Sequence, residues 1–239
     1  MTRRRSAVST TLLLTAIGAL SLSSCATFNR NNVAARVGTH SITPSAARAL
    51  VTPDDQHTSG DLLRQQLTAW IKLDVLDEQQ AKATYEKGVS GSPSVCLAAI
   101  PVATLDATTQ VLNALQSGVS FADAARQFSG NPALASSGGI VPAPDGSECM
   151  APSALAPAVS AALQTTPVGQ PIAANLGTFS AVLLLRPYDE LSFQSRAAVT
   201  AASVSQEQLA VSLADANIYV DPRYGRWDPT TLSVVPLSS

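Results

Sequence analysis

The chain has 239 residues, of which 46% are hydrophobic and 13% are charged. Its formal net charge of −2 falls to −5 if the arginine triplet Arg3–Arg5 is removed with an N-terminal signal, and no Lys/Arg cluster follows that triplet. Because phosphate recognition needs a basic face, a nucleic-acid-binding function is excluded. The length permits one large domain or two small ones, each able to bury a core.

The N-terminus has the layout of a secretory signal that leads into a lipidation site. The apolar run Leu12–Leu20 follows three arginines and is shorter than the roughly 20 residues needed to span a bilayer. A Leu-Ser-Ser stretch then leads into Cys25, as in the lipobox of bacterial lipoproteins. We expect a signal peptide over 1–24, lipid on Cys25, a tether over 25–32, and a location at the extracytoplasmic face of the cell membrane. The alternatives are a secreted protein with a free Cys25 thiol and, third, a short membrane anchor.

Residues 33–92 are expected to form a helical N-terminal segment. Val33–Thr43 indicates a small strand-turn-strand, and Pro44 directly after it is typical of a first helical position. Apolar residues recur at helical spacing over Asp61–Lys87 and predict one long helix. We interpret its apolar face as core packing, and the alternative is a surface groove that grips unfolded chains.

A second region begins after the Gly-Ser-Pro-Ser stretch at 91–94. Its first element is an apolar strand over Val95–Val102, in which Pro101 predicts that one side of the strand lies at a sheet edge. The remaining predicted elements are helices over 105–117, 121–128 and 153–164, an irregular chain over 129–152, and strands over 171–174 and 180–186. This order predicts an α+β fold in which short helices cover a small antiparallel sheet.

The C-terminal part is predicted to contain one long helix over Ser192–Ala214 and a strand over Ile218–Val220. An aromatic tail with Tyr224 and Trp227 follows. These rings are expected to cover the N-terminal helices, and the alternative is that they belong to a client or partner surface.

Two cysteines remain once Cys25 is assigned to lipid. An oxidising extracytoplasmic location favours one disulfide between Cys96 and Cys149, whereas two buried thiols acting as small hydrophobes are the alternative. A disulfide here would fasten the irregular segment to the first strand of the sheet.

The stretch Leu115–Val141, LQSGVSFADAARQFSGNPALASSGGIV, resembles the core of parvulin-type peptidyl-prolyl isomerases. It shares a helix that ends in Gly, a Phe-Ala helix, an aromatic-Ser pair, a polar loop and paired glycines. Upstream, AARVGTHSIT and the helix LLRQQLTAWIKLDVLDEQQAKA resemble the chaperone segment of SurA- and PrsA-like foldases. The resemblance implies a helical SurA-like segment at 33–92, a parvulin-like domain at 95–188, and a C-terminal helix, strand and tail over 191–239 that pack back on the first segment.

The catalytic positions that this resemblance implies are degenerate. Ala99 stands at the first histidine position of active parvulins, Asn131 at the cysteine or aspartate position, and Phe179 at the second histidine position. The only histidines, His40 and His57, precede the domain. Proline isomerisation needs no nucleophile, so their absence should weaken catalysis without by itself abolishing it.

These observations favour a lipid-anchored foldase-like chaperone that binds unfolded or proline-containing exported polypeptides. The alternatives are an active isomerase with an altered pocket and a scaffolding envelope lipoprotein. No cofactor or metal is expected, since the two histidines are widely separated and Gly138-Gly139 lacks the context of a phosphate cradle. The predicted binding pocket comprises Phe128, Met150, Leu155 and Phe179.

Overall fold

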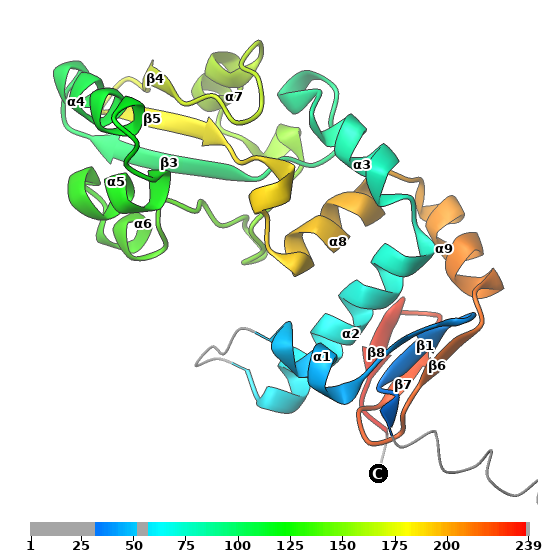
Figure 1. Cartoon of the computed structure of the whole chain (residues 1–239). Coiled ribbons are helices and arrows are strands. Elements are labelled where there is room, and N and C mark those ends of the chain that lie inside the picture. The colour runs from blue at the N-terminus through cyan, green and yellow to red at the C-terminus, as the bar shows by residue number, and fades with distance from the viewer. Residues whose placement is uncertain (1–31, 52–56, 238–239) are drawn as a thin grey trace, which may run out of the picture. The chain divides into compact units, whose positions relative to one another are not determined.

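A computed structural model of the chain describes residues 32–51 and 57–237 (Figure 1). The expected signal peptide over 1–24, the lipid site at Cys25 and nearly all of the tether lie outside the described residues. Within the described parts, no helix has the length and apolar character that crossing a membrane requires. Helices and small antiparallel sheets make up the fold, which confirms the α+β class.

The first sheet joins the beginning of the described chain to its C-terminal part. Strand β1 (Ala35–Val37) lies between β2 (His40–Ile42) and β6 (Ile218–Val220), and both pairings are antiparallel. Gly38 adopts a φ of +55° in the turn between β1 and β2, a conformation that favours glycine. The short helix α1 (Pro44–Ala49) follows with proline in its first turn, as the sequence predicts.

The expected single helix over Asp61–Lys87 is wrong, because the chain breaks near its middle. Helix α2 covers Ser59–Val75 and α3 covers Glu78–Tyr85. Between them Leu76 is extended, and the Asp77 side chain accepts a hydrogen bond from a backbone N–H in the first turn of α3. An aspartate in this position starts a new helix more favourably than it continues an old one.

The expected helix over Ser192–Ala214 is also two helices, α8 (Phe193–Ala202) and α9 (Gln206–Asp215). Ser205 and Gln208 form a reciprocal capping box at the start of α9. The two capping hydrogen bonds satisfy backbone groups that the start of a helix leaves unpaired, so they favour a new start here.

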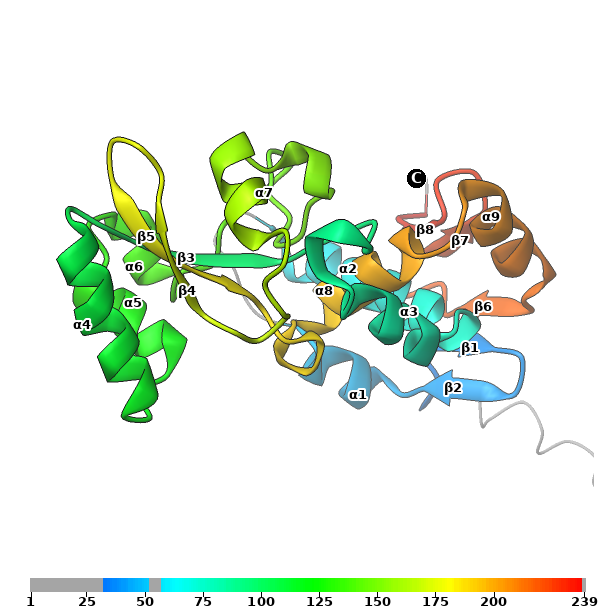
Figure 2. The ribbon, with the colours of Figure 1, turned by 90° about the horizontal axis from the view of Figure 1, so that it is seen from above.

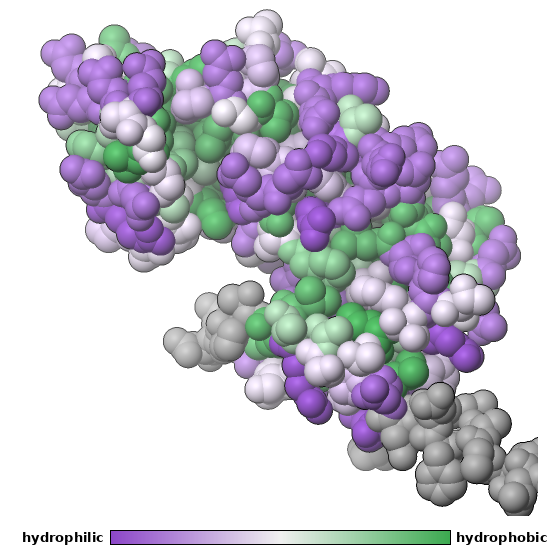
Figure 3. Space-filling model, viewed as in Figure 1, coloured by the Kyte–Doolittle hydropathy of each residue, from purple (hydrophilic) through white to green (hydrophobic). Residues whose placement is uncertain are grey.

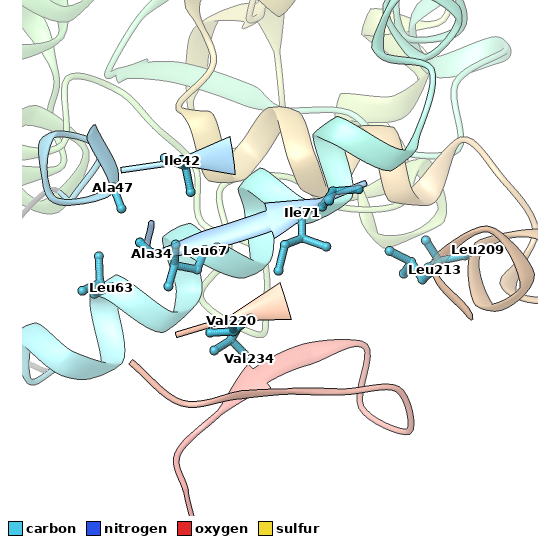
Figure 4. Close-up of a cluster of buried hydrophobic side chains, with 12 residues drawn as sticks. Ala34, Ile42, Ala47, Leu63, Leu67, Ile71, Leu209, Leu213, Val220 and Val234 are labelled. Carbon is cyan, nitrogen blue, oxygen red and sulfur yellow. The ribbon is translucent and has the colours of Figure 1, made fainter. Parts of the chain in front are cut away.

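The C-terminal tail forms a hairpin of β7 (Arg226–Asp228) and β8 (Ser233–Val235), which the sequence did not predict. Val234 is buried, and its N–H donates to the Thr68 hydroxyl of α2 at 2.8 Å. Tyr224 and Trp227 are half-buried against the same core. Figure 4 shows residues of this core, which come from α1, α2, α9, three strands and the residue just before β1: Ala34, Ile42, Ala47, Leu63, Leu67, Ile71, Leu209, Leu213, Val220 and Val234.

The second sheet has the strand order β3-β5-β4, with both pairings antiparallel. Its strands are β3 (Leu97–Val102), β5 (Ser180–Leu185) and β4 (Ile172–Asn175). The backbone nitrogen and carbonyl of Pro101 point away from β5, so the missing N–H costs the β3–β5 ladder no hydrogen bond. The Pro101 carbonyl accepts instead from the Gly130 N–H at 2.8 Å. The segment after Gly130 thus runs back along the side of β3 that β5 leaves open.

Helices cover the two faces of this sheet differently. Helices α4 (Leu105–Gln116) and α5 (Phe121–Phe128) pack on one face, where Ile100, Val102 and Val182 meet Val111, Ala124 and Ala125. Helix α7 (Pro157–Leu163) packs with the opposite face. The short α6 (Pro132–Ser136) lies within the segment that the sequence predicted to be a loop. Three single turns of 3-10 helix complete the described elements: Gly88–Ser90, Pro152–Ala154 and Tyr188–Glu190.

The predicted disulfide between Cys96 and Cys149 is present. It lies in a buried cluster with Tyr85 and Tyr188, whose rings meet edge to face with centroids 5.7 Å apart. Val95 and Met150, which flank the disulfide, exchange backbone hydrogen bonds of 2.8 and 2.9 Å. The irregular segment before Met150 is therefore fastened to the start of β3.

Candidate functional site

A pocket of about 560 Å³ opens on the face of the second sheet that α4 and α5 leave free. Alternate residues of β3 and β5 form its floor, because successive strand residues point to opposite faces. Helix α6, helix α7 and the turn between β4 and β5 supply its walls. Figure 3 shows a band of hydrophobic surface over this sheet, beside α4 and α5. The side chains that give the pocket its apolar character are Leu97, Ala99, Leu134, Val141, Val159, Leu176, Phe179, Ala181 and Leu183.

The three positions that the parvulin alignment selects line this one pocket. Ala99 comes from β3, Asn131 from the start of α6, and Phe179 from the end of the β4–β5 turn. Ala99 is buried in the floor, whereas Phe179 stands at the rim with 43% of its surface exposed. The fold thus brings together residues that are far apart in the chain.

Asn131 uses its side-chain oxygen to start α6. The Oδ1 atom accepts from the backbone N–H groups of Ala133 at 2.9 Å and Leu134 at 3.3 Å. The Asn131 N–H donates to the Ser129 hydroxyl at 3.1 Å, and that hydroxyl donates back to the Asn131 carbonyl at the same distance. Because this oxygen already accepts two backbone hydrogen bonds, its main role is to cap α6, and it has little capacity left to bind a ligand.

The paired glycines after α6 let the chain return close to β3. Gly139 has a φ of +89°, and a Cβ there would lie 3.2 Å from the Ala99 carbonyl oxygen and 3.0 Å from the Phe121 ring. The Gly139 carbonyl accepts from the Ala99 N–H at 2.8 Å. Only glycine combines this conformation with this close approach, so the pair forms a tight turn, as the sequence predicts.

Three of the four predicted pocket residues lie elsewhere. Phe128 packs with the cluster on the α4 and α5 face of the sheet. Leu155 is buried in the core beside the pocket, and Met150 pairs with Val95 and lines a separate hollow that includes Cys149. The sequence missed Leu134, Val159 and Leu176, since no local pattern distinguishes a wall residue from a core residue.

The described residues that line the pocket include no ionisable side chain. His40 lies in β2, where its Nδ1 is 3.1 Å from a carboxylate oxygen of Asp74, and His57 is likewise no part of the lining. Across residues 32–51 and 57–237, no group of three or more His, Cys, Asp or Glu is placed to hold a metal ion. The pocket can therefore exclude water and hold apolar groups, but its own side chains supply no proton donor or acceptor of adjustable pKa.

The apolar face of α2 forms core contacts, because Leu63, Leu67 and Ile71 are buried. The hollow beside it, about 480 Å³ between α2, α8 and β8, has a mixed lining in which charged side chains such as Arg64 and Lys72 stand beside alanines and valines. Burial lowers the pKa of Lys72. The structure thus agrees with the core interpretation of this face.

No protein-family model and no curated protein matches the chain. Among solved structures it is similar to PrsA from Bacillus subtilis, with 16% identity and a TM-score of 0.35 over 65% of this chain and 60% of that chain. It is also similar to the peptidylprolyl isomerase PrsA from Bacillus cereus, with 21% identity and a TM-score of 0.34 over 72% of this chain and 66% of that one. The chain spans 60% of the length of the Bacillus subtilis protein.

Proposed function

We propose that the chain is a lipid-anchored, extracytoplasmic foldase-like chaperone that holds uncharged apolar segments of unfolded exported polypeptides. The observation that carries this proposal is the apolar pocket with the exposed Phe179 at its rim. Concave apolar sites with an aromatic residue at the mouth are where binding energy concentrates. A client segment that buries its own apolar side chain there also withdraws the Phe179 ring from water.

The chemistry of the pocket favours holding over catalysis. Isomerisation of an X-Pro bond requires a barrier of about 18–20 kcal/mol to be lowered, and a dry pocket contributes by desolvating the amide. The polar side chain in the lining, Asn131, is engaged as the cap of α6. We therefore expect stoichiometric suppression of aggregation with little acceleration of proline-limited refolding.

Lipid attachment belongs to the same proposal. The Leu-Ser-Ser-Cys stretch would place the mature N-terminus at Cys25, where newly exported chains emerge. Mass spectrometry of the mature protein should find a diacylglyceryl-modified Cys25, and an unmodified Cys25 or a cleavage elsewhere would contradict the anchor.

The pocket is tested by removing its exposed ring. Phe179→Ala should weaken binding of an unfolded, uncharged model polypeptide by about tenfold. Leu105→Ala is the matched control, because Leu105 is 53% exposed in the same region and does not line the pocket. Equal losses for both variants, or none for Phe179→Ala, would contradict the proposed site.

The alternatives give different results in two assays. A substantial acceleration of proline-limited refolding by the wild type would favour an active isomerase with an altered pocket. Neither acceleration nor suppression of aggregation would favour a scaffolding lipoprotein.

A further inference from the structure

Strand β4 is the outer strand of the second sheet, and one of its edges faces away from β5. The Leu176 N–H donates to the Phe179 carbonyl at 2.9 Å. Hydrogen-bonded pairs in an antiparallel ladder alternate, so the peptide groups of Ala174 and Ile172 also point towards β5. Those of Ala173 and Asn175 must then point outward.

Independent hydrogen bonds support this alternation. Leu185, two residues beyond Leu183, has a carbonyl that accepts from Gly169 on the β4 side of the sheet at 2.8 Å. Ala99 of β3 lies opposite Leu183, whose peptide groups point towards β4, so the Ala99 peptide groups should point away from β5. The Ala99 N–H does so, because it donates to the Gly139 carbonyl at 2.8 Å.

The outward groups of β4 are uncovered. Ala173 and Asn175 are exposed, and the described residues outside the hairpin give neither of them a backbone hydrogen bond. The turn between β4 and β5 extends away from the neighbouring helices (Figure 2). The Asn175 side chain is directed to the turn, where its Oδ1 accepts from Gly177 at 2.9 Å.

No charged side chain in the described part of the chain protects the free edge of β4 from pairing with another strand. Natural sheets protect exposed edges with lysines, inward charges, prolines or bulges. From Ala151 to Leu185 the chain has no ionisable side chain at all. Pro171, two residues before Ala173, would also point its backbone outward but has no N–H to donate. New pairing on this edge is therefore limited to Ala173 and Asn175. The edge of β4 is therefore exposed and uncharged, and it ends at Leu176, which lines the apolar pocket.

We infer that the free edge of β4 is a docking strand, on which an extended segment of a client polypeptide pairs with the backbone of Ala173 and Asn175. This inference rests on the proposed function for the nature of the client. An extended polypeptide is the ligand that offers N–H and C=O groups at the two-residue spacing of these outward groups. Alternate side chains of the added strand would lie over the pocket face, where Leu176 links the edge of β4 to the pocket wall.

A second copy of the chain fits this edge less well. Stable interfaces bury about 800 Å² on each partner. Two outward residues, with a proline before them and a turn after them, offer much less than that as a strand pair. The client segment is therefore the occupant, and self-association is an outcome that the test must report.

The test removes one outward donor. Ala173→Pro deletes the N–H of residue 173, which the β4–β5 ladder does not use, and prolines are tolerated at that kind of position. Ala173→Ser keeps the N–H and is the matched control. The probe is an end-capped peptide of alternating Leu and Thr without proline, so that its binding does not depend on isomerisation.

We expect Ala173→Pro to raise the Kd of this peptide on the full mature chain about threefold to tenfold, the effect of one lost hydrogen bond. Ala173→Ser should leave the Kd unchanged. In the wild type, amide hydrogen exchange at Ala173 and Asn175 should slow when the peptide is added, a readout that remains if Ala173→Pro folds poorly.

Three outcomes would overturn the inference, and they differ in what else they overturn. In the first outcome, Phe179→Ala weakens peptide binding, but Ala173→Pro leaves the Kd unchanged and the peptide does not slow exchange at Ala173 or Asn175. This result rejects the docking strand and keeps the pocket. No peptide binding by the wild type rejects both. A dimer in sedimentation that Ala173→Pro dissociates assigns the edge to self-association instead.

Discussion

The second sheet with its helices, residues 94–185, and the helical region around the first sheet, residues 33–93 and 186–237, differ most in charge. The sheet region has five ionisable side chains, Asp106, Asp123, Arg126, Asp145 and Glu148. The helical region carries most of the ion pairs: His40–Asp74, Arg64–Asp61, Lys82–Asp189, Arg196–Glu78 and Arg223–Asp221. Each of these pairs has at least one solvent-exposed side chain, and such pairs contribute little stability. The contrast therefore concerns surface chemistry, and the sheet region is the one with the less charged surface.

The two regions are joined by a small polar cluster next to the disulfide. Glu148 accepts from Arg186 at 2.8 Å and from the Ser195 hydroxyl of α8 at 2.8 Å. Burial would raise the pKa of Glu148, but these hydrogen bonds outweigh burial and hold the pKa below its ordinary value. Glu148, one of the few charged residues of the sheet region, thus lies at the junction and is not among the residues that line the pocket.

The largest expected effect concerns the helical region and its C-terminal hairpin. Deletion of residues 221–239 removes the buried Val234 and the half-buried Tyr224, Trp227 and Leu232. Burying one large apolar side chain contributes about 1.5–3 kcal/mol, so the loss should be on the order of 4 kcal/mol. Urea unfolding followed by fluorescence measures it, with deletion of 237–239 as the control. An unchanged midpoint for the longer deletion would show that the tail is an accessory surface.

The disulfide gives the next largest effect, and it should act on the sheet region. Replacing Cys96 and Cys149 by alanine opens a loop whose ends are 53 residues apart. The expected loss is about 2–4 kcal/mol of unfolding free energy. Hydrogen exchange should rise first in β3 and the segment before Met150. If α2 loses protection to the same degree, the two regions unfold as one unit and the comparison fails.

Tyr85 tests the junction between the regions at alkaline pH. Its hydroxyl donates to the Arg186 carbonyl at 2.7 Å and accepts from the Cys96 N–H at 3.3 Å. Burial raises the pKa of Tyr85 to about 12. Since an unfolded tyrosine titrates near pH 10, the native state is favoured fully below pH 10, and this contribution is lost as the pH rises from about 10 to 12.

The stability difference between the wild type and Tyr85→Phe should therefore shrink by about 2–3 kcal/mol across that range. Chemical denaturation at several pH values measures it. A difference that stays constant would mean that the folded Tyr85 hydroxyl ionises as freely as the unfolded one.

The sequence predicted elements better than it predicted their ends. Apolar periodicity runs across Asp77 and Ser205, so it predicted one helix in each place where two exist. Both residues are good N-caps, and that signal was present but weaker than the periodicity. The β7–β8 hairpin was missed because proline, glycine and charged residues interrupt this segment, so no apolar run marks its first strand, Arg226–Asp228.

The site was predictable only through the family resemblance. Ala99, Asn131 and Phe179 share no local pattern, and their convergence depends on the pairing of β3 with β5 and on the return of the chain through Gly139. Phe128 and Met150 are apolar and were predicted to line the pocket, but the sequence does not show on which side of the sheet they pack. The alternation of side chains across β3, which decides the face, requires the register that only the structure provides.

The smallest expected effect separates the helix-capping role of Asn131 from its place in the pocket. Asn131→Ala removes the acceptor of two backbone N–H groups and should cost about 1 kcal/mol of stability. Asn131→Asp keeps the cap, so its unfolding midpoint should stay near that of the wild type. The same substitution places a carboxylate among the apolar walls of the pocket. An uncharged peptide that binds there would bury this unpaired charge, which costs free energy, so peptide affinity should fall. If both variants change stability and affinity in the same proportion, Asn131 acts on the pocket only by shaping α6, and the apolar walls alone define the site.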